Sequence, residues 1–324
     1  MKTSWHGSAL FTLITIVPVI AYAQPTAKQS WPTRPVRMVV GFSTGGPVDI
    51  SARLLSPKLS EQWGQPVVVE NRPGAGSAIA TAMVAQATPD GYTFLLTSAS
   101  FAINAVLRPK SGYDPLRDFA SVSQIGYSTS ALVVPPSLNV RTIKELIALA
   151  HERQGSILYG SAGAGSGTHF TTERFNLAAG IKGKHVAFKG QSEMTIEVLA
   201  GRLHFGVPTL GVALGMIRDG RLRALAVVTP RRSPLLPEVP AMVEILPHFK
   251  RDAAHMVLAP AKTPRAIITK VSQDIARVLD MPDIKKQMEA IDFVPAATTP
   301  EELDKVVREM MVIFDEVARA AGLK

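Results

Sequence analysis

The sequence lacks the residue types on which several functional classes depend. Its 324 residues include no cysteine, so disulfides, thiolate metal sites and cysteine nucleophiles are excluded. Aromatic residues make up only 6% of the chain and the basic residues are dispersed, a pattern that disfavours nucleic acid as a partner. After the N-terminal segment, no apolar run reaches the roughly 20 residues that a membrane-spanning helix needs.

Motifs for cofactors and metals are missing as well. The strand-to-helix turns contain neither G-x-G-x-x-G nor G-x-x-x-x-G-K-[ST], which argues against dinucleotides and nucleoside triphosphates. There is no H-E-x-x-H pair, and the seven histidines show no metal-ligand spacing. We therefore predict a protein without a cofactor, a metal ion or catalytic residues.

The N-terminus has the pattern of a secretory signal peptide. Lys2 supplies a short positive region, Ala9 to Ile20 form an apolar stretch, and Ala21-Tyr22-Ala23 is an A-x-A cleavage site. We predict that residues 1–23 are removed after Ala23 and that the mature protein is soluble and periplasmic. The net charge of +9 falls to +8 without Lys2, with 34 basic against 26 acidic residues, and this surplus suits anionic ligands.

Two glycine turns organise the rest of the chain. In the first, an apolar strand (Val36–Val40) leads through Gly45-Gly46 to a helix that opens at Pro47, a residue favoured in the first helical position. In the second, an apolar run ending at Tyr159 leads through Gly160–His169 into another helix. Free backbone N–H groups and the helix dipole make each turn a candidate anion site. We expect the two turns to face one cavity, although either could be an ordinary strand-to-helix connection.

Short apolar strands alternate with helical stripes along the whole chain. Thr142-x-x-Glu145 is a capping box, and Gly180 is a helix stop. This alternation predicts an α/β fold of mostly parallel sheets with helices on both faces, where ligands lie beyond the carboxyl ends of the strands. The expected strands cover residues 36–40, 67–69, 92–97, 122–124, 157–159, 185–188, 203–207, 222–228 and 254–259, with an apolar segment at 131–134.

Three candidate site residues have two interpretations each. Asp49, in the first turn of its helix, either stabilises the helix dipole or orients the glycine loop. His169, at the start of the second helix, either contacts a ligand carboxylate or caps its own helix. Lys189 is either a surface lysine or a cationic rim for an acid. The sequence does not choose between these interpretations.

Several ordered motifs resemble the Bug-type substrate-binding proteins of tripartite tricarboxylate transporters. The resemblance covers nearly the whole mature chain. The segments that carry it are Trp31–Val36, Gly41–Asp49, Gly64–Gly76, Pro89–Tyr92, Tyr113–Pro115, Phe188–Gly190, Gly220–Ala226 and Leu236–Pro240. One position departs from the family: Pro208 and Thr209 stand where relatives that bind amino dicarboxylates carry an acidic residue toward the ligand's amine. This departure disfavours an amino acid ligand. A second change, to Ala254-His255-Met256-Val257, replaces the family's common aromatic segment.

The resemblance implies a two-lobed periplasmic binding protein of the type II-like kind, with a ligand cleft between its lobes. Lobe 1 would comprise residues 31–130 and 255–324, and lobe 2 residues 131–254, with crossing segments near 131–134 and 254–259. Family members bind carboxylates through the glycine loops. The candidate ligand-binding residues are Phe42, Ser43, Thr44, Gly45, Gly46, Asp49, Ser98, Ala162, Gly163, Ser166, Thr168, His169, Lys189 and Thr209.

The predicted function is a monomeric receptor that captures a small organic acid and presents it to the membrane permease of a tripartite transporter. One alternative is a carboxylate sensor that feeds a signalling partner, since its binding site would be identical. A second alternative is an exported hydrolase that uses Ser166 and His169, which lie three residues apart at a helix start. No acidic partner for such a pair is evident in the sequence.

Overall fold

The computed structural model describes residues 1–3, 31–108, 110–153, 155–229, 231–247, 249, 254–320 and 322–323. The apolar stretch and the cleavage site of the predicted signal peptide lie outside these residues. All elements named below belong to residues 32–324, which form one unit. Among the described residues, no helix has the length and apolar character needed to cross a membrane.

A six-stranded mixed sheet forms the framework of one region. Its order is β10-β4-β9-β3-β1-β2, with β1 parallel to β2 and β3, and β9 antiparallel to β3 and β4. The strands are β1 (Val36–Val40), β2 (Val67–Asn71), β3 (Thr93–Ser98), β4 (Phe119–Ser128), β9 (Ala254–Pro260) and β10 (Phe293–Pro295). We call these strands and their covering helices the six-stranded region.

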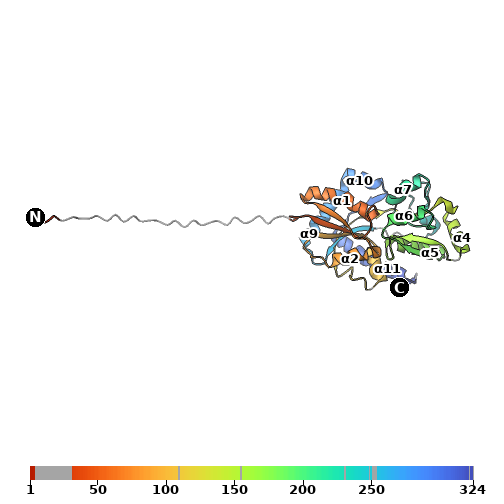
Figure 1. Cartoon of the computed structure of the whole chain (residues 1–324), viewed down its shortest axis with the longest axis horizontal. Coiled ribbons are helices and arrows are strands. Elements are labelled where there is room, and N and C mark those ends of the chain that lie inside the picture. The colour runs from red at the N-terminus through yellow and green to blue at the C-terminus, as the bar shows by residue number, and fades with distance from the viewer. Residues whose placement is uncertain are drawn as a thin grey trace. The chain divides into compact units, whose positions relative to one another are not determined.

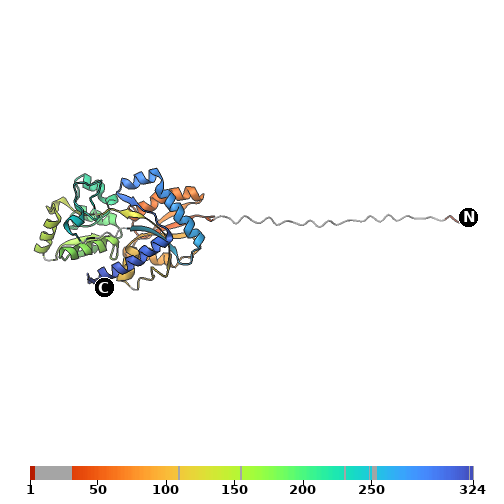
Figure 2. The same cartoon turned by 180° about the vertical axis from the view of Figure 1, so that it is seen from behind.

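Helices cover both faces of this sheet (Figures 1 and 2). On one face α1 packs against α9, and α10 packs against α9 and β10; on the other, α2 and α11 contact α3. The core of the second face includes Leu95, Phe101, Met256 and Phe314, all buried. The helices are α1 (Pro47–Trp63), α2 (Ala78–Ala85), α3 (Ser100–Leu107), α9 (Arg265–Asp280), α10 (Pro282–Glu289) and α11 (Pro300–Ala320), with a 3₁₀ turn η1 (Ala75–Ser77).

The remaining elements form what we call the small-sheet region. Figure 1 shows α4, α5, α6 and α7 gathered there. Its strands are β5 (Ala131–Val134), β6 (Leu158–Ser161), β7 (Lys184–Ala187) and β8 (Arg223–Val227), paired as β5-β8 and β6-β7. Its helices are η2 (Pro136–Leu138), α4 (Ile143–Glu152), α5 (Gly167–Ala179), α6 (Gln191–Leu199), α7 (Leu210–Arg218) and α8 (Met242–Ile245). Two separate apolar clusters form its core.

The strand predicted at residues 203–207 is present only as isolated bridges. Gly206 pairs with Val133 of β5, and Phe205 pairs with Tyr159 of β6. This stretch therefore lies between the two short sheets and joins them through backbone hydrogen bonds. It also carries the chain to Thr209 at the start of α7.

The expectation of mostly parallel sheets needs correction. Three strand pairs are parallel and four are antiparallel. The physical reason is the passage between regions: β4 continues through only Thr129 and Ser130 into β5 of the other region, without the crossover that would return the chain to its own sheet as a parallel strand. On the return, β9 enters the six-stranded sheet between β3 and β4 and runs against both. Strand and helix alternation in the sequence does not reveal this reversal.

Candidate functional site

The loop between β1 and α1 is held by hydrogen bonds within itself. The Gly45 N–H donates to Asp49 Oδ2 at 2.8 Å, and the Gly46 N–H donates to the Ser43 carbonyl at 3.2 Å. The expectation that both glycines leave uncovered N–H groups is therefore wrong. The helical hydrogen bonds of α1 begin with the Ile50 N–H, which donates to the Gly46 carbonyl. Val48 lies ahead of this bond in the first turn, so the amides at the helix start become the candidate donors in place of the glycines.

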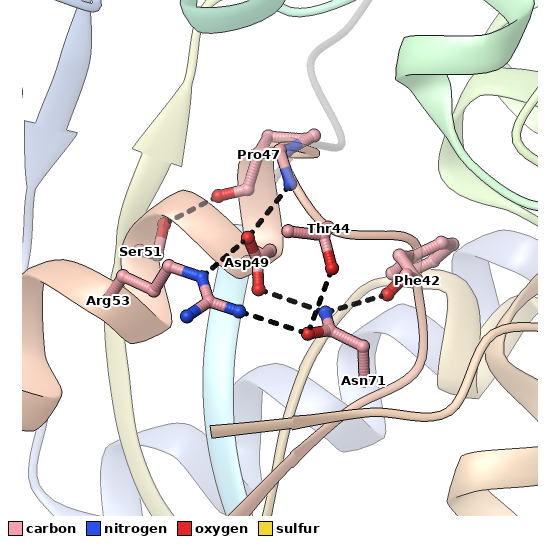
Figure 3. Close-up of polar contacts among 8 residues, drawn as sticks. Phe42, Thr44, Pro47, Asp49, Ser51, Arg53 and Asn71 are labelled. Atoms are coloured by element: carbon pink, nitrogen blue, oxygen red, sulfur yellow. Dashed lines mark hydrogen bonds and ion pairs between the residues drawn. The ribbon is translucent and has the colours of Figure 1, made fainter. Parts of the chain in front are cut away.

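Asp49 is the centre of this loop's support (Figure 3). Its carboxylate accepts from Gly45 N–H, from Arg53 Nε at 2.9 Å and from Asn71 Nδ2 at 2.9 Å, and Asn71 also donates to the Phe42 carbonyl at 3.0 Å. Burial by itself would raise the pKa of Asp49, but the hydrogen bonds from Arg53, Gly45 and Asn71 outweigh it and hold the pKa below its usual value. The ionised carboxylate thus positions the loop from behind.

The loop between β6 and α5 uses neutral groups instead. Ser166 caps α5, because its Oγ accepts the His169 N–H at 3.2 Å, and Thr168 Oγ1 accepts the Ala162 N–H at 2.9 Å. The two hydroxyls are 3.0 Å apart, so one donates to the other. Two hydroxyls hold two protons and only one is used between them. The pair can therefore offer one O–H to a ligand.

The His169 ring supports the same loop. Its Nδ1 accepts the Gly165 N–H at 3.2 Å, which assigns the ring proton to Nε2, and the ring stacks on His185 with centroids 4.0 Å apart. Burial, followed by the positive charges of His185 and Arg108, lowers the pKa of His169 to about 4. The imidazole is therefore neutral at ordinary pH and acts as a loop acceptor.

The geometry offers little to a serine hydrolase. Ser166 Oγ contacts the backbone of His169, and the imidazole Nδ1 is used by Gly165, as in a helix cap. The stretch Gly41–Gly45 also matches the G-x-S-x-G spacing of a nucleophile elbow, with Ser43 at its centre. Ser43, however, is outside the residues with positive φ, and α1 begins only at Pro47. Ser43 and Ser166 each accept a hydrogen bond that supports its own loop, and neither lies in the strained turn of a nucleophile elbow.

The second glycine loop also touches the six-stranded region. Asn104 Nδ2, on α3, donates to the Gly76 carbonyl at 2.7 Å and to the Gly165 carbonyl at 3.1 Å. A Cβ added at Gly163 would lie 2.8 Å from Gly76 N, and one at Gly165 would lie 2.1 Å from Asn104 Oδ1. The glycines thus allow a backbone approach between the two regions that no side chain would permit. We call this contact the glycine interlock.

One pocket lies where these loops converge. It encloses about 580 Å³ of empty space, including the part open to solvent. Six predicted residues line it: Phe42, Ser98, Ala162, Ser166, Thr168 and Thr209. The flanks of both glycine turns therefore line one cavity. The other predicted residues lie outside the pocket lining: Ser43, Thr44, Gly45, Gly46, Asp49, Gly163, His169 and Lys189.

More than half of the residues that line the pocket were not predicted from the sequence. The further lining residues are Pro47, Val48, Ala99, Ser130, Gly167, Thr171, Gln191, Val207 and His255. Pro47, Val48, Ala99 and Gly167 each adjoin a predicted residue and could have been added from the helix starts. His255, on β9, gave no such signal. Its Nδ1 lies 2.9 Å from Ser51 Oγ, which already donates to the Pro47 carbonyl and so accepts the ring N–H.

The pocket wall carries no formal charge on an acidic or basic side chain. Its lining includes no Asp, Glu, Lys or Arg. The first residues of α1, α5 and α6, together with the N-caps of α3 and α7, all contribute to it. Partial positive charge from converging helix N-termini and neutral hydroxyls therefore dominate the site. Within the described part of the chain, no cluster of His, Asp and Glu is arranged to hold a metal ion.

The fold and the interregional pocket define the class as a two-lobed periplasmic binding protein. A solved structure of periplasmic binding protein BugD matches with a TM-score of 0.87 and 29% identity, over 91% of this chain and 99% of that one. A solved structure of R. palustris Rpa4515 with adipate matches with a TM-score of 0.84 and 32% identity, over 90% and 98%. Protein BugT of Bordetella pertussis (strain Tohama I) is 33% identical over 305 residues, 93% of this chain and 94% of BugT.

The family model described as "Tripartite tricarboxylate transporter family receptor" matches residues 51–323. The chain belongs to this receptor family. The resemblance and the fold class predicted from the sequence are both confirmed. The family is one of periplasmic solute-binding receptors.

Proposed function

We propose that this protein captures a small organic carboxylate in the pocket and delivers it to the membrane permease of a tripartite transporter. Residues 31–130 with 255–324 would act as lobe 1 and residues 131–254 as lobe 2. The observation that carries the proposal is the convergence of helix starts from both regions on one uncharged cavity. The adipate bound to the similar Rpa4515 agrees with this ligand class.

The chemistry of the wall suits a carboxylate. Each helix N-terminus favours a nearby anion by about 0.3–1 kcal/mol when exposed and up to about 2 kcal/mol when partly buried. Hydrogen bonds to a charged acceptor are about twice as strong as neutral ones, and they strengthen as water is excluded. Ser98, Ser166 and Thr168 supply hydroxyls at the same wall. Four or five such donors would bind the acid without any arginine or lysine.

The candidate residues then divide by role. Those in the lining, such as Ser98, Ser166 and Thr168, would contact the ligand. Asp49 and His169 would hold the two loops in place from behind, through the bonds to Gly45 and Gly165 described above. This division accounts for the absence of Asp49 and His169 from the pocket wall. It also gives Ser166 and His169 roles in binding and loop support, which favours the receptor over the hydrolase.

A thermal-shift screen of mono-, di- and tricarboxylates tests the ligand class. An acid present at 100 times its Kd should add about 2.7 kcal/mol to the free energy of unfolding. Putrescine and glucose are the controls and should produce no shift. A protein stabilised by sugars or peptides, and by no organic acid, would contradict the proposal. The double variant S166A/T168V should weaken the best acid by about 10-fold or more, while K189A should not.

Delivery needs a separate experiment. Cells that lack this protein should lose high-affinity uptake of the acid that the screen identifies, and a wild-type copy should restore it. Uptake that survives the deletion would instead favour the sensor. Mass spectrometry of the periplasmic protein should find an N-terminus at Gln24 if the signal peptide is cleaved after Ala23. Light scattering of the purified protein should give the mass of one chain.

A further inference from the structure

One buried hydroxyl in the pocket has no partner among the residues that the structure describes. Thr209 is only 4% exposed and lines the pocket, yet its Oγ1 makes no hydrogen bond there. A buried polar atom without a partner normally destabilises the fold, because the hydrogen bond to water that it gave up is not replaced. Thr209 is also the N-cap of α7, a position where threonine usually bonds the helix backbone, but this side chain makes no cap bond. The hydroxyl therefore stays buried and unpaired in a residue of the pocket wall.

The surroundings of Thr209 are rigid and rich in donors. Its own N–H donates to Gln191 Oε1 at 2.8 Å, and its carbonyl accepts from Val212 and Ala213 in the first turn of α7. The Thr209 N–H is a donor, so the atom of the Gln191 side chain that faces it must be the acceptor Oε1. The other end of the amide is then Nε2, which carries two further N–H groups in a residue of the pocket wall. The Leu210 N–H bonds the Thr129 carbonyl and anchors the start of α7. Thr209 is thus a fixed donor at the small-sheet side.

We propose that Thr209 is a specificity-determining residue whose hydroxyl is completed by a ligand oxygen, and that this end of the pocket selects acids without an ammonium group. The inference rests on the proposed function and deepens it. An ammonium beside Thr209 would face the positive ends of α5 and α7 without a carboxylate in the lining to pair with it. Glu193, further along α6, is outside the lining; its Oε2 lies beside Gly190 and has no hydrogen-bond partner among the described residues.

Isothermal titration with matched acids tests this selectivity. Succinate, glutarate and adipate are each compared with their 2-amino counterparts, aspartate, glutamate and 2-aminoadipate. The wild-type protein should bind its best plain diacid at least about 100-fold more tightly than the amino form, because a buried charge without a partner is expensive. Equal binding of the amino form would overturn the inference. Failure of every carboxylate would overturn the proposed function itself, which is a different result.

Substitutions separate a ligand contact from a structural role. T209V keeps the shape but removes the hydroxyl, so affinity for the best acid should fall about 10- to 100-fold, the range for a hydrogen bond to a charged group. The stability of the ligand-free protein should stay equal or rise, because an unpaired buried hydroxyl is removed. T209S should keep affinity within about threefold. Unchanged affinity in T209V would refute the role.

The matched control is T81V. Thr81 is fully buried in α2, its Oγ1 donates to the Ser77 carbonyl at 2.8 Å, and it lies outside the pocket lining. Its loss should lower stability and leave affinity within about twofold, the reverse of T209V. If T209V behaved like T81V, Thr209 would be an ordinary core threonine.

Discussion

The two glycine loops look alike in sequence but are supported in different ways. The β1–α1 loop depends on an ionised carboxylate, with Asp49 between Arg53, Asn71 and the Gly45 N–H. The β6–α5 loop depends on hydroxyls and a neutral imidazole, and it packs against the other region through the glycine interlock. The first loop is stabilised within its own region, and the second has a further support from Asn104 across the boundary between regions.

This difference has a consequence for binding. Charge behind the first loop stays away from the pocket wall, and the second loop brings none, so the wall presents helix starts and hydroxyls from both regions. The two supports should nevertheless respond differently to substitution and to pH. A carboxylate support fails when it is protonated in strong acid, whereas an imidazole support fails earlier, when the ring gains a proton.

The largest expected effect is at the interlock. In G165A the new Cβ would meet Asn104 Oδ1 and would also sit at a φ of +83°, so we expect a loss of about 3 kcal/mol. G180A is the control, since Gly180 has a φ of +65° and nothing within 4 Å of an added Cβ. It should lose about 1 kcal/mol from strain alone. Urea denaturation measures both, and equal losses would mean that the interlock contributes nothing.

The carboxylate support comes next. D49N places an amide against the Gly45 N–H and removes the bond to Arg53, so about 2–3 kcal/mol should be lost at pH 7. Because the folded pKa of Asp49 is depressed, this contribution is complete above about pH 4 and fades as the pH falls through the folded value.

The exposed pair Asp304–Arg308 has the same four-residue spacing as Asp49–Arg53 and serves as the control. D304N should cost no more than about 0.5 kcal/mol at any pH. Similar losses in D49N and D304N, measured by urea denaturation, would show that Asp49 has no special role.

The imidazole support should be visible as a pH dependence. The folded pKa of His169 is about 4, below the value of about 6.5 for an unfolded chain, so the unfolded state binds more protons between these values. Stability should therefore fall as the pH drops from 6.5 toward 4, by about 1–2 kcal/mol at pH 5. H169N keeps an acceptor near the position of Nδ1 and should flatten this slope. Parallel curves for wild type and H169N would contradict the assignment.

The smallest effect is expected at Lys189. This residue is exposed and lies outside the pocket lining, although the sequence offered it as a cationic rim. K189A should change the affinity for the best acid by less than about twofold at 0.15 M salt, because exposed charges are screened. A tenfold loss in titration calorimetry would bring Lys189 back into the site as a cationic rim.

Elements with strong local signals were predicted closely from the sequence. β1 has the expected bounds, α1 begins at Pro47, and α4 carries the Thr142 cap with its bond from the Glu145 N–H. α5 ends at Gly180 in the left-handed conformation. Helix α3, the short helix α10 and strand β10 were missed. α3 follows β3 almost at once and has no side-chain cap bond, so no start signal marked it.

The candidate site was predicted only where it follows a strand-to-helix turn. Ser166 and Thr168 belong to such a turn and line the pocket. Gln191 and His255 do not, and their place in the wall depends on packing between segments far apart in the chain. The Gly45 N–H is the opposite case: the sequence predicted that it would be free to bind a ligand, but it donates to the Asp49 carboxylate.

Local chain chemistry was enough to locate the strands, the helix starts and the two loops, because proline, glycine and capping residues act over a few positions. Which groups stay available at the pocket wall depends instead on contacts between segments that are far apart in the sequence. Asn71 joins Asp49 from 22 residues away and Asn104 reaches Gly165 across 61, and such contacts form only once distant segments have packed together. Long-range packing decides which N–H and O–H groups form hydrogen bonds within the protein. A short stretch of sequence therefore does not show which of these donors remain free.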